Sequence, residues 1–276
     1  MNRRLALLVI LVAAGCLAEL PRISHSAPNA PGLIAALDTV FLEEMTWTEV
    51  RDALDSGKTT VLVPTGGVEQ NGPYVATGKH NFILRATTEA IARKLGNALV
   101  APIVPFVPEG TIDPPTGHMK YPGTLSVTED TYERLLTDLC ASLRVHGFRH
   151  IVLLGDSSGN QQGMQTVAKR LTAQWAKDKV RVHFLAEYYN YAEVERWLAE
   201  QGIRLENENV HDDFVVTAQL LAANPTTVRL QQRLVGGQFR ISGLTWTPAE
   251  AAEWGKKIIA FRADRSVQAI RKAVQQ

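Results

Sequence analysis

The sequence is short of cysteine and of net charge, and both shortages exclude classes of protein. Its formal net charge is +1, so the charge balance predicts no binding to nucleic acid or to an anionic surface. There are 2 cysteines, at positions 16 and 140. If Cys16 leaves with an N-terminal signal, Cys140 cannot form an internal disulfide, and the fold must depend on its core. Cys140 lies at helical spacing from Leu136 and Leu143, which predicts a buried small side chain and not a nucleophile.

The apolar run at 5–18 is too short for a firm membrane span. Two arginines precede it, and small residues follow at 24 and 26. This order predicts a secretory signal peptide over 1–26, cut near Ala27, and therefore an exported protein, periplasmic or secreted, with no stable membrane span after processing. A buried N-terminal helix is the alternative interpretation.

The segment AAGC at 13–16 resembles a lipoprotein signal, in which Cys16 would be acylated. Ala13 stands where such signals usually have leucine, so this variant is the weaker prediction. A chain of 276 residues could form one large domain or two small ones, and either is long enough to bury a real core. The order of strands and helices favours a single domain over residues 27–276.

Apolar strands and amphipathic helices alternate along that domain. The alternation predicts an α/β fold, a three-layer sandwich with a mainly parallel central sheet and helices on both faces. Asn81 is expected to cap one helix, which Gly96 ends. The strands are expected at 59–67, 98–108, 150–155 and 180–189, and the helices at 46–57, 81–95, 128–145, 164–177, 191–200, 214–223 and 248–274.

Polar side chains gather in the loops that leave three of these strands, at 65–80, 108–124 and 155–162. In parallel sheets the carboxyl ends of the strands meet at one edge, where binding sites form. Taken singly, each candidate has a structural explanation, such as a helix cap or a satisfied loop. The candidates are Glu69, Asn71, Tyr74, His80, His118, Asp156, Ser157 and Asn160, with His211, Asp212 and Asp213 further along the chain.

Carboxylates together with imidazoles are suitable ligands for Zn²⁺ or Mn²⁺. A catalytic site of this kind needs about three protein ligands and an open position for water. Glu69, His80 and Asp156, with His211 in reserve, could supply that number. Their spacing ties no two of them to one helix face, so the metal prediction rests on residue type and on the strand ends alone.

The segment GDSSGN at 155–160 also suggests a serine hydrolase. A chymotrypsin-like protease is excluded, because that fold is all-β. An SGNH-type esterase would use Ser157 as its nucleophile. Such enzymes have the GDS turn near the mature N-terminus and a DxxH segment near the C-terminus, whereas this turn lies mid-chain and no DxxH occurs. A serine nucleophile also needs a base within hydrogen-bond reach.

Four motifs in order resemble those of the creatininase (creatinine amidohydrolase) family. The first loop reads EQNGPYVATGKH at 69–80, where the family reads E-Q-H-G-P-H-L-P-L-G-T-D. The second reads HMKYPGT at 118–124, against H-x-x-F-P-G-T. The third strand ends in GDSSGN, against N-G-H-G-G-N, and HDDFVVTA at 211–218 stands against H-A-G-x-x-E-T-S. The resemblance spreads over most of the chain after the predicted signal.

This resemblance implies an α/β sandwich, often a homo-oligomer, that hydrolyses amide C–N bonds of small molecules with two metals at the strand ends. Glu69 keeps the identity of a family ligand. A bridging carboxylate serves two metals, whereas an imidazole nitrogen serves one, so the resemblance implies that the two-metal cage is absent here. The family's other ligand positions fall on Asn71, His80 (the bridging Asp), Ser157, Gly159 and Val216.

The leading hypothesis is therefore an exported, creatininase-like hydrolase with one divalent metal, Zn or Mn, and a small-molecule substrate. His118, on the long loop, or Asp213 would be the acid or base that serves the leaving nitrogen. Two alternatives stay open: a non-catalytic remnant that binds a small ligand, and a metal-free esterase using Ser157. The expected ligands are Glu69, His80, Asp156 and His211, and the expected pocket residues are Asn71, Tyr74, Ser157 and Asn160.

Overall fold

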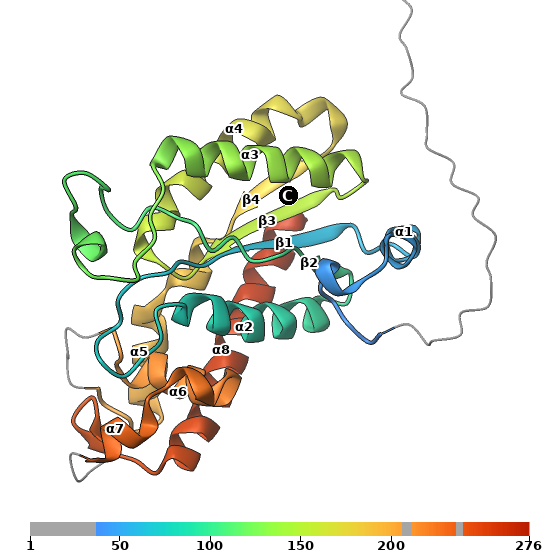
Figure 1. The fold of residues 1–276 in the computed structure, drawn as a ribbon. Helices are drawn as coiled ribbons and strands as arrows, with labels where there is room; N and C mark the ends of the chain where they lie inside the picture. The colour runs from blue at the N-terminus through green and yellow to red at the C-terminus, as the bar shows by residue number, and fades with distance from the viewer. Residues whose placement is uncertain (1–36, 206–210, 236–239, 276) are drawn as a thin grey trace, which may run out of the picture. The chain divides into compact units, whose positions relative to one another are not determined.

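Four parallel strands form the central sheet, in the order β2-β1-β3-β4. The structure, a computed structural model, describes residues 37–205, 211–235 and 240–275 (Figure 1). The predicted signal peptide at 1–26, with Cys16, lies outside the described residues. The strands are β1 (Thr60–Thr65), β2 (Ala98–Val100), β3 (His150–Gly155) and β4 (Arg181–Phe184), and a small antiparallel hairpin joins β5 (Arg240–Ile241) to β6 (Leu244–Thr245).

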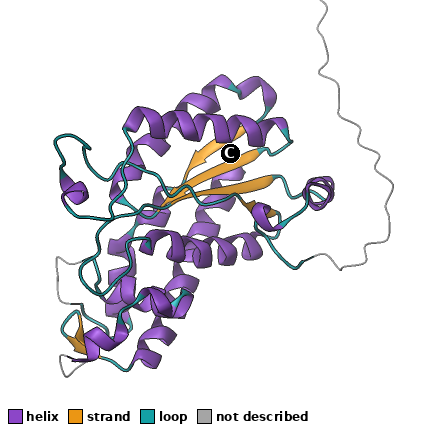
Figure 2. Ribbon diagram, in the orientation of Figure 1, coloured by secondary structure: helices purple, strands orange, loops and turns teal. Residues whose placement is uncertain are grey.

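Helices cover both faces of the sheet, which confirms the predicted three-layer α/β fold (Figures 1 and 2). On one face lie α3 (Glu129–Val145) and α4 (Gln161–Gln174), and on the other lie α2 (Lys79–Leu95) and α8 (Pro248–Val274). The other α-helices are α1 (Trp47–Asp55), α5 (Tyr191–Glu200), α6 (Phe214–Ala223) and α7 (Leu230–Val235). Short 3₁₀ helices occupy Leu42–Glu44, Gly117–Lys120, Ser158–Asn160, Ala176–Asp178, Ala186–Tyr189 and Pro225–Thr227.

The buried apolar side chains form three clusters. One lies between the sheet and α3 with α4, and a second between the sheet and α2 with α8. The third joins α6, α5 and α8 beyond the sheet. All six residues of β1 are buried, as expected for a strand with a helical layer on each face. The loops that carry the polar candidate residues follow the carboxyl ends of β1 and β3, at one edge of the sheet.

Two strands are shorter than the sequence predicted. β2 ends at Val100, because prolines at 102, 105 and 108 have no N–H to continue the ladder. The chain beyond it still follows β1 through an isolated bridge between Thr65 and Val104. β4 ends at Phe184, where the chain turns into the 3₁₀ helix Ala186–Tyr189. The predicted strands were therefore right in place and too long at their ends.

Helix α2 begins at Lys79, with Gly78 as its N-cap residue. The prediction that Asn81 caps this helix is wrong. The Asn81 side chain instead accepts a hydrogen bond from the Gly67 N–H (3.3 Å) and donates one to the Gly67 carbonyl (3.2 Å). This pair of bonds fixes the loop after β1 against α2, and it places the side chains of Lys79 and His80 in the first helical turn.

Cys140 is fully buried in the cluster under α3, as the sequence predicted, and burial raises the pKa of its thiol to about 12. A thiol in this environment is protonated and unreactive at neutral pH. Among the described residues, no helix combines the length and the apolar character needed to cross a membrane.

Candidate active site

The loop after β1 carries Glu69 into the interior, where it is 3% exposed. The backbone N–H of Glu69 donates to the Thr77 carbonyl (3.0 Å), which closes the loop on itself. Asn71 stabilises the same loop, because its amide donates to the carbonyls of Glu69 (2.9 Å) and Ala76 (3.0 Å). Asn71, predicted as a pocket residue, is thus a buried brace of the loop that positions Glu69.

Four basic side chains surround the Glu69 carboxylate. Lys79 Nζ lies 3.1 Å and His80 Nε2 2.9 Å from its Oε1 atom, and both side chains are buried. His211 Nδ1 lies 3.2 Å from the same oxygen. His118 Nε2 lies 3.3 Å from the other oxygen, Oε2. The chain therefore brings residues 69, 80, 118 and 211, which are far apart in sequence, to one carboxylate.

The charge of Glu69 is maintained by these neighbours. Burial by itself would raise the pKa of Glu69, but hydrogen bonds from His211 and His80, with the charges of His80 and Lys79, hold it well below the ordinary value. The pKa of His118 is lowered, chiefly by burial and against the attraction of Glu69. A carboxylate beside a neutral imidazole is a pair of groups that can bind a metal ion or a proton.

His80 connects Glu69 to a second buried carboxylate. Its Nδ1 atom lies 3.0 Å from Asp156 Oδ2, while its Nε2 atom faces Glu69. The other oxygen of Asp156 accepts hydrogen bonds from Arg262 (2.6 Å) and from the Tyr191 hydroxyl (3.0 Å). Burial would raise the pKa of Asp156, but Arg262 and His80 lower it to about 2. Both ring nitrogens of His80 and both oxygens of Asp156 thus have protein partners.

Among the described residues, one group has the arrangement of a metal site: Glu69, His118 and His211, whose ligand atoms all lie within 4.8 Å of one another. One carboxylate and two imidazoles form a ligand set that catalytic zinc sites use, with a position left for water. Gln70 supports the set, because its amide lies 3.3 Å from His118 Nδ1 and leaves Nε2 directed at Glu69. The three residues of the set could hold a single ion.

Glu109 is a site residue that the sequence reasoning missed. It lies on the long loop, is 5% exposed, and its Oε2 atom accepts a hydrogen bond from Ser157 Oγ (3.4 Å). Burial and the negative charge of Glu69 raise the pKa of Glu109 to about 9. The sequence could have indicated Glu109, because this residue stands between a proline and a glycine at the start of the loop 108–124, which was expected at the carboxyl edge of the sheet.

Ser157 and Asn160 hold the loop after β3. The Ser157 hydroxyl donates to Glu109 and accepts from the Gly159 N–H (3.3 Å). Among the described residues, no histidine is hydrogen-bonded to the Ser157 hydroxyl, so the base that a serine nucleophile needs has not been found there. The Asn160 amide donates to the carbonyls of Thr65 (2.9 Å) and Gly66 (3.0 Å) and ties this loop to the end of β1.

The three residues at 211–213 have different roles. His211 joins the site, whereas Asp213 caps α6 by accepting a hydrogen bond from the Val216 N–H (2.8 Å), and burial raises its pKa. Asp212 forms a buried ion pair with Arg233. The Arg233 guanidinium also lies over the Tyr74 ring, 4.9 Å from its centroid, so Tyr74 joins the loop after β1 to this pair.

Replacing Asn160 by alanine is expected to lower the free energy of unfolding by about 2–3 kcal/mol, because the buried carbonyls of Thr65 and Gly66 each lose one donor. Urea denaturation of wild type and variant measures the difference. Gln162→Ala is the matched control, because the Gln162 amide bonds the Thr166 hydroxyl on the exposed side of α4. Equal losses in the two variants would contradict the bracing role of Asn160.

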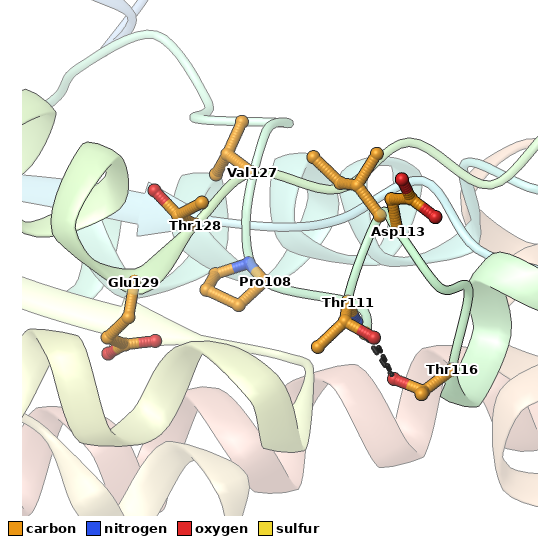
Figure 3. A pocket seen from close by; sticks show the side chains of 9 residues that line it. Pro108, Thr111, Asp113, Thr116, Val127, Thr128 and Glu129 are labelled. Atoms are coloured by element: carbon orange, nitrogen blue, oxygen red, sulfur yellow. Dashed lines mark hydrogen bonds between the residues drawn. The ribbon is translucent and has the colours of Figure 1, made fainter.

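A pocket of about 690 Å³ lies beside the long loop (Figure 3). Thr111 and Thr116 face each other on its wall, with their hydroxyl oxygens 2.8 Å apart. Glu69, His118 and His211 do not line it, so this hollow is separate from the candidate metal site. Its lining residues are Pro108, Gly110, Thr111, Ile112, Asp113, Thr116, Val127, Thr128 and Glu129.

One family of known proteins matches most of the chain. The family model described as "Creatininase: Creatinine amidohydrolase" matches residues 43–270. The 3-dehydro-scyllo-inosose hydrolase of Thermotoga maritima is 26% identical over 188 residues, 67% of this chain and 57% of that protein. The chain thus matches less than two thirds of that relative's length. The creatinine amidohydrolase of Pseudomonas putida is 25% identical over 199 residues, 70% of this chain and 75% of that protein.

Among solved structures, one named "Creatininase Mn" has a TM-score of 0.66 at 21% sequence identity, covering 86% of this chain and 100% of that chain. At this identity the likeness shows the shared fold. The match of the family model, the two hydrolases and the fold agree with the four motifs read from the sequence. The chain belongs to the creatininase family.

Proposed function

We propose that this chain hydrolyses a C–N bond, of the amide or cyclic-amide type, in a small molecule, with one divalent metal held by Glu69, His118 and His211. The observation that carries the proposal is the convergence of these three side chains, with ligand atoms within 4.8 Å of one another. The relatives named as hydrolases and as a manganese form of creatininase support the reaction class and the metal. Zn²⁺ and Mn²⁺ both suit this ligand set.

A bound divalent ion supplies a water of lowered pKa and polarises a carbonyl. The chain's own residues prepare the site for that chemistry. Asp156 orients His80, and His80 with Lys79 holds Glu69 ionised and in place. His80 and Asp156, which the sequence proposed as ligands, therefore act through Glu69 in this proposal.

Proton transfer to the leaving nitrogen needs an acid near the centre. The sequence proposed His118 or Asp213 for this task. In the structure, His118 joins the metal-binding group and Asp213 is hydrogen-bonded within its own helix. Glu109 lies in the same buried cluster as Glu69 and contacts Ser157, so we include Glu109 as the proton donor. Export through a signal at 1–26 and assembly into a homo-oligomer stay predictions.

A second candidate is a non-catalytic protein that binds a small ligand in the same place. One observation favours it: the ammonium of Lys79 already lies 3.1 Å from Glu69 and neutralises part of the charge that would attract a metal. The esterase alternative is less favoured, because Ser157 contacts a carboxyl group, Glu109, that keeps its proton at neutral pH.

Metal content tests the proposal. The chain from residue 27 is stripped with EDTA, reconstituted with Zn²⁺ or Mn²⁺, freed of excess ion and measured by mass spectrometry. We expect about one ion per chain in wild type and none in Glu69→Gln or His118→Ala, because each variant removes a ligand. His146→Ala is the control, because His146 is exposed at the end of α3.

Hydrolysis of a panel of lactams, ureides and linear amides is followed in parallel, by release of ammonia, amine or carboxylate. For any compound of the panel that wild type hydrolyses, the turnover should fall at least about 100-fold in Glu69→Gln and should persist in Ser157→Ala. Wild-type protein that holds no more metal than the buffer blank after reconstitution would sink the metal-hydrolase proposal. Activity lost in Ser157→Ala alone would favour the esterase.

A further inference from the structure

Lys79 is an unexpected member of the site, because its charged ammonium group is buried in the interior of the protein. The residue is 4% exposed, and its Nζ atom contacts Glu69 Oε1 (3.1 Å) and the His211 carbonyl (3.4 Å). Burying an ammonium costs several kcal/mol unless a charge and hydrogen bonds compensate. Glu69 and the His211 carbonyl supply that compensation.

Helix α2 gives no reason of its own for a lysine here. Lys79 is the first residue of α2, which starts after Gly78. The helix dipole places positive charge at this end, so a cation there destabilises the helix. Burial and the helix dipole both oppose the lysine, and Glu69 is the feature of the structure that favours it. The position is therefore explained by the carboxylate and not by the fold of the helix.

His80 adds a second donor to the same oxygen. Its two ring nitrogens face Glu69 Oε1 (2.9 Å) and Asp156 Oδ2 (3.0 Å). Both ring nitrogens of His80 are therefore engaged by buried carboxylates, and neither is left for another partner. Glu69 Oε1 thus contacts the buried side chains of Lys79 and His80 as well as His211, whereas Oε2 faces His118 alone among the basic residues.

We infer that Lys79 is a fixed cation of this site, which with His80 occupies hydrogen-bonding positions of Glu69 Oε1 and limits the centre to one metal ion. The lysine also keeps the carboxylate ordered when no metal is bound, because it contacts Oε1 directly. Lys79 acts through Glu69 and is a positioning residue. The inference rests on the proposed function only for the use of Glu69 as a metal ligand.

Thermal melting of Lys79→Met, with and without metal, tests this role. In EDTA, we expect its melting temperature to fall by about 10 °C relative to wild type, because Glu69 is left buried without a main counter-charge. Lys94→Met is the control, because Lys94 lies on the same helix in an exposed ion pair with Asp264. Added Zn²⁺ or Mn²⁺ should raise the melting temperature of Lys79→Met by more than that of wild type, since the ion replaces the lost positive charge.

The double variant Glu69→Gln with Lys79→Met removes the charge and its partner together. It should melt above Lys79→Met in EDTA, and it keeps the test open if the single variant does not fold. The inference is overturned if Lys79→Met and Lys94→Met have the same melting temperature in EDTA, or if metal raises the melting temperatures of Lys79→Met and wild type equally. It is also overturned if the double variant melts no higher than Lys79→Met, or if wild type binds two ions. Wild type that binds no ion defeats the proposed function but leaves the EDTA comparison decisive for Lys79.

Discussion

Replacing Arg262 by methionine is expected to lower the free energy of unfolding by about 3–5 kcal/mol, because it leaves a buried carboxylate without its main partner. Arg262 is 3% exposed, and its guanidinium donates to Asp156 Oδ1 (2.6 Å), to the Tyr188 carbonyl (3.0 Å) and to Gln219 Oε1 (2.9 Å). The group also lies over the Tyr188 ring, 4.2 Å from its centroid. Methionine fills part of the volume and satisfies none of these acceptors.

The effect should also reach the site. Asp156 positions His80, and His80 positions Glu69, so the variant should bind metal more weakly even at temperatures where it is folded. Urea denaturation gives the stability, and metal titration followed by mass spectrometry gives the binding. Arg265→Met is the matched control on the same helix, because Arg265 is about half exposed in its pair with Glu193 and should cost at most about 1 kcal/mol. Similar losses in both variants would show that Arg262 has no special structural role.

Replacing Glu109 by glutamine is expected to make the metal-free protein progressively more stable than wild type as pH rises. The pKa of Glu109 is raised from its ordinary value of 4.5 to about 9, first by burial and then by the charge of Glu69. Between these values the folded chain keeps the proton and the unfolded chain does not. The stabilising contribution is thus complete below about pH 4.5 and is lost as pH rises toward 9, by up to about 1.4 kcal/mol per pH unit.

Glutamine is neutral at every pH and has no proton to release, so this loss disappears. Urea denaturation in EDTA at about pH 5, 7 and 8.5 should give a difference between variant and wild type that grows by about 2–4 kcal/mol over the range. Glu253→Gln serves as the control, because Glu253 is exposed on α8 and should leave the slope of wild type unchanged. A constant difference across pH would mean that Glu109 ionises normally in the folded chain.

Several features followed from the sequence without any structure. Residues 191–200, 214–223 and 248–274 were predicted as helices and form α5, α6 and α8 with those same limits. Local signals suffice there, because apolar periodicity and a capping residue, such as Asp213 or Thr247, act within a few residues of the helix start. The family could likewise be identified from four short motifs, and the candidate residues Glu69 and Asp156 lie beyond the carboxyl ends of β1 and β3, where they were expected.

The partners within the site could be decided only by the tertiary structure. Glu69 lies 11 residues from His80 but 142 from His211, and Asp156 meets Arg262 across 106 residues. Whether His80 faces a metal or two carboxylates depends on how α2, β3 and α8 pack, and residue type does not determine that packing. Lys79 was passed over because a lysine is usually solvated, and Glu109 because its neighbours are distant in sequence. The sequence determined which loops reach this edge of the sheet, since the positions of strands and loops follow from local patterns. The contacts and charges of the site residues were decided by the tertiary structure. A carboxylate that is removed from water needs a cation or a hydrogen-bond donor beside it, and the packing determines which one is there.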